Sequence, residues 1–423
     1  MSNEKLEINE FFKKLGFKDD NINLRQKCME NFLKDGFPSK KHEDWKFFDF
    51  DKIILNEIPN LNFFNDAILK DLYYADKIQK LGFSIKEYNH IIFVNGFIQN
   101  IELNHEDQNK IEVIRNNSID TIKNESLINL NNALSYDYIK LLVKDKYIFN
   151  KPLLILSFSN DLITNINFNS RIDIEMEKNS ILSMADINFH NSKKNFFNLN
   201  KNIKLAEGSI LKNYILDPFN NENLHYTNTK IDLEGNSVAE NFILSSGSNF
   251  SKNEIICNLK EQYSSAFVNG IINLNNNKKH EIRTKISHLS ENTKSYQLVK
   301  CALKDEAKAV YQGKIFVDQV AQKTNAYQLS KGLLLDENTE FNTKPELEIY
   351  ADDVKCSHGS TSGNIDKDAL FYLKARGIKE KEAIKMIIKG FLESVLKNIE
   401  NNEILNILLN HFNTHIKYES RSN

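Results

Sequence analysis

A cysteine and a histidine two residues apart, Cys356 and His358, have the residue types and spacing most suited to chemistry in this sequence. If they continue the apolar strand at 347–350, both side chains project from one face, about 7 Å apart. A thiolate and an imidazole could then bind a soft metal such as iron, or form a Cys/His nucleophile pair. Alternatively, Cys356 is a buried apolar residue and His358 a hydrogen-bonded strand end. Two ligands are too few for a cluster, so a metal site here needs donors from a second chain.

Other catalytic patterns are weak or absent. Asp352 and Asp353 suggest a carboxylate pair or the acidic cleft of a β-helical polysaccharide lyase, but neighbours on a strand point to opposite faces. The pair Gly313-Lys314 lacks the earlier glycine of a phosphate-binding loop. The motifs GxSxG, HExxH and GxGxxG do not occur. We therefore expect no ATPase activity from this chain alone, and no enzyme of these classes.

Composition argues against a protein that binds nucleic acid or inserts into a membrane. Its formal net charge is −2, with 26% of residues charged and the two signs interspersed. The N-terminus lacks a basic segment followed by an apolar core, and no apolar run could span a bilayer. The four cysteines are Cys28, Cys257, Cys301 and Cys356. They are far apart and include no CxxC pair, which argues against a zinc site and for a reducing compartment. We expect a cytoplasmic protein.

Some single residues carry expectations of their own. Trp45, the sole tryptophan, is expected to anchor the N-terminal helices to the rest of the chain. Cys28 lies on an apolar helix face and should be core. Six histidines show no ligand spacing and are expected to be ordinary surface or turn residues: His42, His105, His190, His225, His280 and His288.

The elements that must position these residues fall into three regions. Residues 1–88 have apolar spacings of three and four, typical of helices, and 363–423 do as well. Between them, 89–362 alternates apolar and polar residues in short runs, as in Ile172-Asp173-Ile174-Glu175-Met176, which is typical of strands. In the last region, Asp366 can cap a helix that Gly377 ends. Helices at this place could cap the core, dock a partner, or do both.

A weak repeat runs through the strand region. Acidic turns followed by Ser, Thr or Ala recur at intervals of 30, 27, 27, 30, 15 and 31 residues, near Glu177, Glu207, Glu234, Glu261, Glu291, Glu306 and Glu337. One interval is half of its neighbours, as expected if each long step holds two strand–turn units. This favours a β-helix of stacked strands. An antiparallel sandwich with regularly spaced turns remains the alternative.

The segment 344–359 (KPELEIYADDVKCSHG) closely resembles the signature of the SufB/SufD family of iron–sulfur cluster assembly proteins. Its continuation from Asp366 to Phe391 and the N-terminal Glu43-Asp44-Trp45-Lys46 resemble the family too. Within it, Cys356 to Thr361 is similar to SufD members. SufB members have a cysteine some thirty residues upstream, where this chain reads SKGLLL from Ser330.

The resemblance implies a right-handed parallel β-helix with helical ends, acting as a SufD-type scaffold subunit. It implies pairing with SufB through the β-helices, with a nascent iron–sulfur cluster formed at the seam and bound only transiently. His358 is then a candidate cluster-site residue, and Cys356 a weaker one. The SufC ATPase would dock on the C-terminal helices, with candidate contacts Phe371, Tyr372, Arg376, Ile387 and Phe391.

Further possibilities stay open at this point. A homodimer could form in the absence of SufB. A reduced flavin could accompany the complex, although no residue identifies a flavin site. The alternatives are a structural adaptor with no metal ligand, or a SufB-like scaffold that binds a cluster itself.

Overall fold

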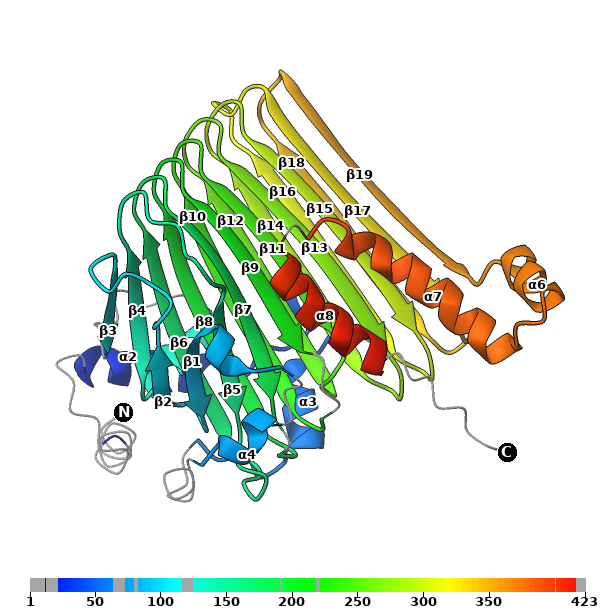
Figure 1. Ribbon diagram of the computed structural model, residues 1–423, viewed down its shortest axis with the longest axis horizontal. Coiled ribbons are helices and arrows are strands. Elements are labelled where there is room, and N and C mark those ends of the chain that lie inside the picture. The colour runs from blue at the N-terminus through cyan, green and yellow to red at the C-terminus, as the bar shows by residue number, and fades with distance from the viewer. Residues whose placement is uncertain are drawn as a thin grey trace.

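The computed structural model describes residues 12, 22–63, 73–79, 83–115, 125–190, 192–217, 221–399 and 401–415. Their strands wind into a parallel β-solenoid made of two sheets (Figure 1). Sheet I has the strand order β19-β17-β15-β13-β11-β9-β7-β5-β1-β2, and sheet II the order β18-β16-β14-β12-β10-β8-β6-β4-β3. From β4 onward the chain alternates between the sheets, and from β6 onward each strand pairs in parallel with the strand two places earlier. The expected parallel β-helix is confirmed, and the antiparallel sandwich is wrong.

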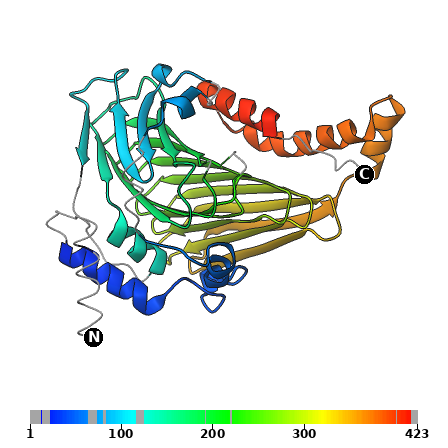
Figure 2. The same cartoon turned by 90° about the horizontal axis from the view of Figure 1, so that it is seen from below.

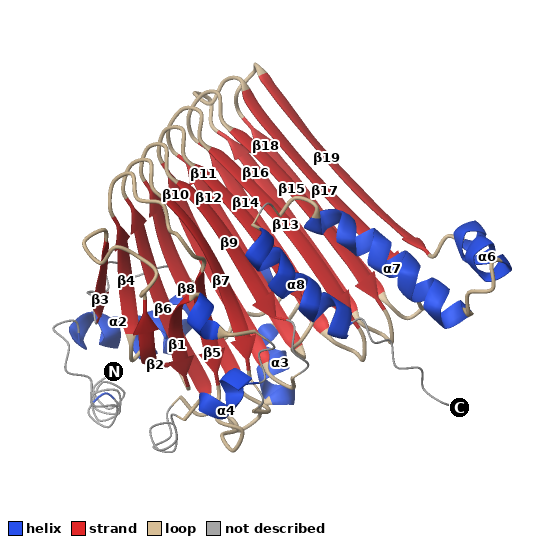
Figure 3. Cartoon of the chain, viewed as in Figure 1, coloured by secondary structure: helices blue, strands red, loops and turns tan. Residues whose placement is uncertain are grey.

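The strands lengthen toward the C-terminal end (Figure 3). Sheet I consists of β1 (Asn89–Val94), β2 (Phe97–Glu102), β5 (Leu153–Phe158), β7 (Ile181–Phe189), β9 (Ile210–Asp217), β11 (Val238–Ser245), β13 (Ser265–Leu274), β15 (Lys294–Leu303), β17 (Thr324–Leu334) and β19 (Val354–Asn364). Sheet II consists of β3 (Ile111–Arg115), β4 (Tyr138–Val143), β6 (Asn167–Met176), β8 (Phe196–Leu205), β10 (Leu224–Leu233), β12 (Phe250–Leu259), β14 (Lys279–His288), β16 (Lys308–Val317) and β18 (Glu340–Ile349). At the N-terminal end, antiparallel pairs β1–β2 and β3–β4 complete the two sheets.

The repeat counted in the sequence marks the corners of the solenoid. Five of its acidic turns lead from sheet II to sheet I, those at Glu177, Glu207, Glu234, Glu261 and Glu291. The remaining two, at Glu306 and Glu337, lead from sheet I to sheet II. The half-length interval is therefore the change from one corner to the other. Hydroxyls stabilise these turns: Ser180 donates to the Glu177 carbonyl and Ser237 to the Glu234 carbonyl, both at 2.6 Å.

The interior is filled by apolar side chains stacked coil on coil. One column of fully buried residues follows the register of sheet II through Ile174, Ile203, Ile231, Cys257 and Ile286. Burial raises the pKa of the Cys257 thiol to about 12 and that of Cys301, also in the core, further still. These two thiols are packing residues, because they stay protonated and have no access to solvent.

Helices of the N-terminal region cover the outer face of sheet II (Figure 2). They are α2 (Ile22–Asp35), η1 (Glu43–Trp45), α3 (Phe50–Glu57) and α5 (Ser126–Leu134), while α4 (Ala75–Ile78) and η4 (Ile85–Glu87) lie between α3 and β1 in the chain. Trp45 is 6% exposed and packs against Phe50 and Phe250, with the Lys252 ammonium 4.1 Å from its ring centroid. Its anchoring role is confirmed, as is the burial of Cys28.

Ion pairs with β14 and β18, and hydrogen bonds from Lys252 on β12 and Gln312 on β16 to the Asp44 carbonyl, fasten the same N-terminal segment to sheet II. Glu43 pairs with Lys344 on β18, and Asp44 with Arg283 on β14. Beneath them, the buried Lys252 on β12 donates to Glu281 on β14 at 2.7 Å. On β16, Gln312 Nε2 donates to the same Glu281 Oε1 at 2.7 Å. The Glu-Asp-Trp motif is therefore a strap over the sheet.

The C-terminal helices are α6 (Lys367–Ala375), α7 (Glu380–Leu396) and α8 (Asn402–His415). Asp366 caps α6 by accepting from the N–H groups of Asp368 and Ala369, and Gly377 follows its end with φ +85°, as predicted. Helices α7 and α8 lie along the outer face of sheet I rather than over the last coil (Figure 1). Helices α7 and α8 therefore do not cover the last coil of the solenoid. None of the described helices is long and apolar enough to cross a bilayer.

The expectation of surface or turn histidines is wrong for four of the six. His42 and His105 are exposed, but His190, His225 and the two later ones are buried. The His190 ring stacks on Phe197 with centroids 3.6 Å apart. His280 hydrogen-bonds to Ser245 and Ser248, and His288 to Thr293 and Ser295. The partners of His280 lie about one coil earlier in the chain, whereas those of His288 lie five and seven residues later.

Candidate functional site at the last coil

The Cys356–His358 segment lies on β19, the last strand of sheet I, and does not continue the preceding strand. Strand β18 ends at Ile349, the chain turns over 350–353, and β19 begins at Val354 in the other sheet. Asp352 and Asp353 are exposed in that turn rather than on a strand. Asp353 uses its backbone there, donating to Gln322 Oε1 and accepting from Lys323 N–H. The two carboxylates are turn residues.

Cys356 and His358 share one face of β19, as predicted. They pair in register with Ala326 and Gln328 on β17, which are 0% and 2% exposed, so both positions face the solenoid interior. Cys356 is half-buried in an apolar cluster with Ile315, and burial raises the pKa of its thiol. The neutral thiol is therefore favoured, which makes Cys356 the poorer metal ligand.

His358 is exposed, because no further coil covers β19 among the described residues. No hydrogen bond or ion pair joins its ring to another side chain in the described part of the chain. Its neighbour Gln328 donates to the Glu346 carbonyl at 3.4 Å. Both nitrogens of the imidazole remain available to a ligand from outside the chain.

Hydroxyl groups line the interior beside His358. Ser330 Oγ lies 3.0 Å from Ser360 Oγ and 3.1 Å from Thr343 Oγ1, and Ser330 is 1% exposed. Ser330, Thr343 and Ser360 therefore form a partly buried hydroxyl network on the interior side of the last coil. Sequence reading missed Gln328 and the Ser330 contacts. The repeat in the sequence could have predicted both contacts, because Gln328 and His358, like Ser330 and Ser360, are about one coil apart.

The free edge of β19 exposes the backbone of the candidate residues. In sheet I, the Asn325 N–H donates to the carbonyl of Thr293, the residue just before β15, so the odd-numbered residues of β17 face β15 and the even-numbered residues face β19. In a parallel ladder, two residues in register point their N–H and C=O groups in the same direction, so the even-numbered residues of β19 point away from β17. The N–H and C=O groups of Cys356, His358, Ser360 and Ser362 therefore point away from β17, toward a strand that the described chain does not supply.

The two terminal strands differ in how well their edges are protected. Strand β18 carries four charged side chains, and Pro345 removes one N–H from its free edge. Strand β19 spans 11 residues, Val354–Asn364, and has a single residue of full charge, Lys355. A long edge with so little charge is a template for strand addition. The edge that bears His358 is thus the open one.

The candidate ATPase contacts separate into two groups. Phe371 and Tyr372 are 73% and 54% exposed on α6, a helix with no buried residue, and the Arg376 guanidinium lies 4.5 Å from the Tyr372 ring centroid. Ile387 and Phe391, on α7, are half-buried. Figures 1 and 2 show α6 standing away from the body of the solenoid.

Lys300 on β15 fastens α7 to sheet I. Its ammonium lies 4.6 Å from the centroid of the Phe391 ring. It also donates to the Phe391 carbonyl at 3.0 Å and to Ser394 Oγ at 2.6 Å. Phe391 is therefore occupied by this contact, whereas the exposed aromatic pair on α6 offers free surface.

The described residues contain no group of three or more His, Cys, Asp or Glu side chains placed to hold a metal ion. A site at His358 needs ligands from a second chain, as the spacing of the sequence suggested. The geometry defines a class of protein: a β-solenoid with an unpaired terminal edge and a projecting helical arm.

Comparison with known proteins gives the family. Residues 160–391, more than half of the chain, match the family model described as "SUF system FeS cluster assembly, SufBD core domain". The chain belongs to the SufB/SufD family of iron–sulfur cluster assembly proteins. It is 26% identical to iron–sulfur cluster assembly protein SufD of Escherichia coli over 86% of each chain. Shorter matches are 46% identical to a SufBD-family protein of Synechocystis, over 24% of this chain and 23% of that one, and 34% identical to SufD of Bacillus subtilis, over 27% and 26%.

Proposed function

We propose that this chain is the SufD-type subunit of a cluster assembly complex, and that it pairs with a SufB-type sister through the free edge of β19. The observation that carries the proposal is this edge, which is long, almost uncharged and lined with outward-pointing backbone groups. An added strand would lie about 4.8 Å from β19. Its side chains would then stand about 5 Å from those of Cys356 and His358.

That spacing supports a shared metal site at the seam. A thiolate on the partner strand and the imidazole of His358 could both reach one iron atom, which is the cargo of the complex rather than a resident cofactor. His358 contributes one nitrogen ligand or one hydrogen bond, while the partner contributes thiolates. Cys356 remains mainly a packing residue, since burial favours its protonated form.

We further propose that a SufC-type ATPase docks on α6 and that its motion opens and closes the seam between β19 and the partner strand. Exposed Phe371 and Tyr372 provide an aromatic anchor of the kind that dominates protein interfaces. A motion of α7 would be transmitted to β15 through Lys300, and β15 belongs to the same sheet as β19. Opening and closing the β19 seam is the two-state element that such coupling requires.

A proline placed at the free edge tests the pairing. In Ser360→Pro, the lost N–H is one that points away from β17, so the solenoid keeps its ladder while an added strand loses a donor and meets the ring. We expect a folded chain that no longer co-purifies with the SufB-type subunit. The matched control, Ser360→Ala, should retain the partner. Normal co-purification of the proline variant would show that β19 is not the interface.

The role of His358 has its own test in the assembled complex. His358→Ala should leave subunit stoichiometry intact and lower the iron and acid-labile sulfide recovered with the complex. Ser357→Ala, one residue away on the opposite face, is the control. Unchanged iron and sulfide in His358→Ala would make the chain a structural adaptor. A stoichiometric cluster on the isolated chain would make it a SufB-like scaffold.

A further inference from the structure

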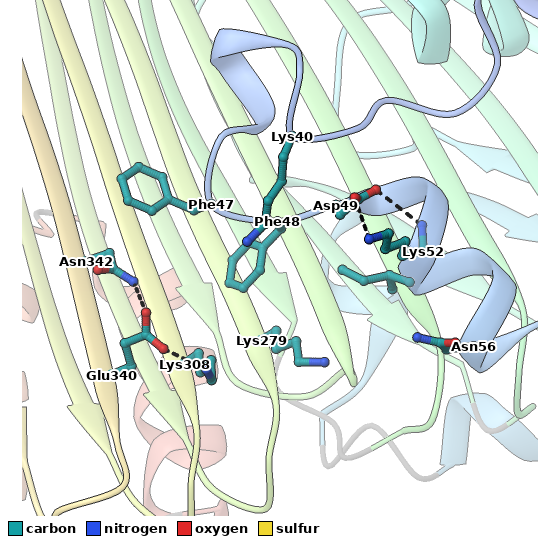
Figure 4. Close-up of a pocket in the computed structure, with 11 residues that line it drawn as sticks. Lys40, Phe47, Phe48, Asp49, Lys52, Asn56, Lys279, Lys308, Glu340 and Asn342 are labelled. Carbon is teal, nitrogen blue, oxygen red and sulfur yellow. Dashed lines mark hydrogen bonds and ion pairs between the residues drawn. The ribbon is translucent and has the colours of Figure 1, made fainter.

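A basic hollow of about 370 Å³ lies where the N-terminal segment meets the outer face of sheet II (Figure 4). Four lysines reach it from four different elements: Lys40 from the turn before η1, Lys52 from α3, Lys279 from β14 and Lys308 from β16. None of these residues belongs to the free edge of β19. The hollow is therefore separate from the proposed seam.

The charges around the hollow are only partly balanced. Lys308 pairs with Glu340 at 2.6 Å, and Lys52 approaches Asp49 at 3.8 Å. Hydrogen bonds from Lys308 and Asn342 lower the pKa of Glu340, which keeps this carboxylate ionised. Four ammonium groups thus face two carboxylates, which leaves a net charge of +2.

Two of the lysines have no partner of their own. Neither the Lys40 ammonium nor the Lys279 ammonium makes a hydrogen bond or ion pair with any residue in the described ranges. Lys279 is half-buried at the start of β14, where its side chain lines the hollow. Convergence of like charges at one hollow is explained if an anion binds between them.

An apolar wall stands beside the charges. Figure 4 shows the rings of Phe47 and Phe48 flanking the hollow on the side where Lys40 enters. Phe47 is half-buried, Phe48 is 6% exposed, and Ile53 of α3 also lines the space. A ligand that fills the hollow therefore meets both ammonium groups and hydrocarbon surface.

We propose that this hollow binds a phosphate monoester that carries a planar ring, of about the size of a mononucleotide. A phosphate monoester has a charge of about −1.5 to −2 at pH 7, which balances the +2 of the site. The volume is at the lower end of the range of small-molecule sites, about 300–1,000 Å³. The phosphate lies between Lys40 and Lys279, and the ring packs against Phe47.

Titration calorimetry of the full-length chain tests this with AMP as the probe. Lys40→Ala/Lys279→Ala removes the two unpartnered charges and should weaken AMP binding about tenfold per lysine, or about a hundredfold in all. The matched control Lys41→Ala/Lys294→Ala removes the same net charge from exposed positions outside the hollow and should bind AMP normally.

Two further ligands separate the parts of the proposal. Inorganic phosphate and adenosine should each bind at least about tenfold more weakly than AMP, because each lacks one of the two contacts. No AMP binding, or equal binding by the Lys40/Lys279 variant, overturns the site. Phosphate binding as tightly as AMP overturns the ring contact, and adenosine binding as tightly overturns the anion contact. Each readout is independent of the SufB-type subunit.

Discussion

Acid should destabilise the solenoid through two buried histidines, His280 and His288. Burial lowers the pKa of each imidazole from 6.5 to about 4 in the folded chain. The neutral ring of His280 already makes hydrogen bonds through both nitrogens, to Ser245 Oγ and to the Ser248 carbonyl, each at 2.7 Å. A proton added to either ring therefore enters a site with no solvent to receive the charge.

The size and sign of the effect follow from linkage. A histidine with a lowered folded pKa binds fewer protons when folded, so its contribution is present above the unfolded pKa of 6.5. That contribution falls as the pH drops from 6.5 toward 4 and is then constant. Between pH 7.5 and 5.5 each histidine should remove about 1.3 kcal/mol from the free energy of unfolding, and the pair about 2.6 kcal/mol.

Urea unfolding followed by circular dichroism at pH 7.5 and 5.5 measures this loss. Comparison within each variant cancels the carboxylates that titrate at lower pH. In His280→Gln/His288→Gln the loss between the two pH values should be smaller by about 2.6 kcal/mol than in the unsubstituted chain. His42→Gln, at an exposed position, should behave like the unsubstituted chain. An equal acid loss in the double variant would refute the reasoning.

Three further variants test the buried contacts and the proposed docking surface. Trp45→Ala should cost about 3–5 kcal/mol of unfolding free energy, because it empties the centre of the strap that fastens the N-terminal segment. Lys201→Met should cost about 3–5 kcal/mol, because it leaves the buried Asp186 carboxylate without its counter-charge. Phe371→Ala/Tyr372→Ala should change unfolding by no more than about 0.5 kcal/mol, yet abolish co-purification of the ATPase.

Matched controls sharpen these comparisons. Lys204→Met, at an exposed position of the same strand as Lys201, should be nearly neutral in urea unfolding. Tyr263→Ala removes an exposed ring far from α6 and should retain the ATPase. A Trp45→Ala or Lys201→Met chain as stable as the parent would show that the burial argument fails. Retention of the ATPase by the α6 variant would move the docking surface elsewhere.

The architecture could be predicted from sequence patterns, because a solenoid is a nearly one-dimensional stack of similar coils. Each coil repeats a turn, and the acidic turns at Glu177 and Glu207 already report the coil length. The change of corner at Glu306 was readable as a half interval. The boundaries of α6 followed from Asp366 and Gly377, since caps act within a few residues.

The parts that sequence reading missed depend on contacts between distant coils. His280 is polar and was expected at the surface, but its partners lie about one coil earlier. The strap formed by Glu43 and Lys344 joins residues some 300 positions apart. The openness of β19 was equally hidden, because a strand becomes an edge only when the whole sheet is assembled.

Amide-resolved hydrogen exchange of β19 tests the pairing of this edge most directly. In the chain at a concentration where it is monomeric, the amides of Ser357, Gly359 and Thr361 are hydrogen-bonded to β17, while those of His358 and Ser360 face solvent. Addition of the SufB-type subunit should slow exchange at His358 and Ser360 by more than about tenfold and bring the alternation to an end. Unchanged fast exchange at these two amides within an assembled complex would contradict the pairing.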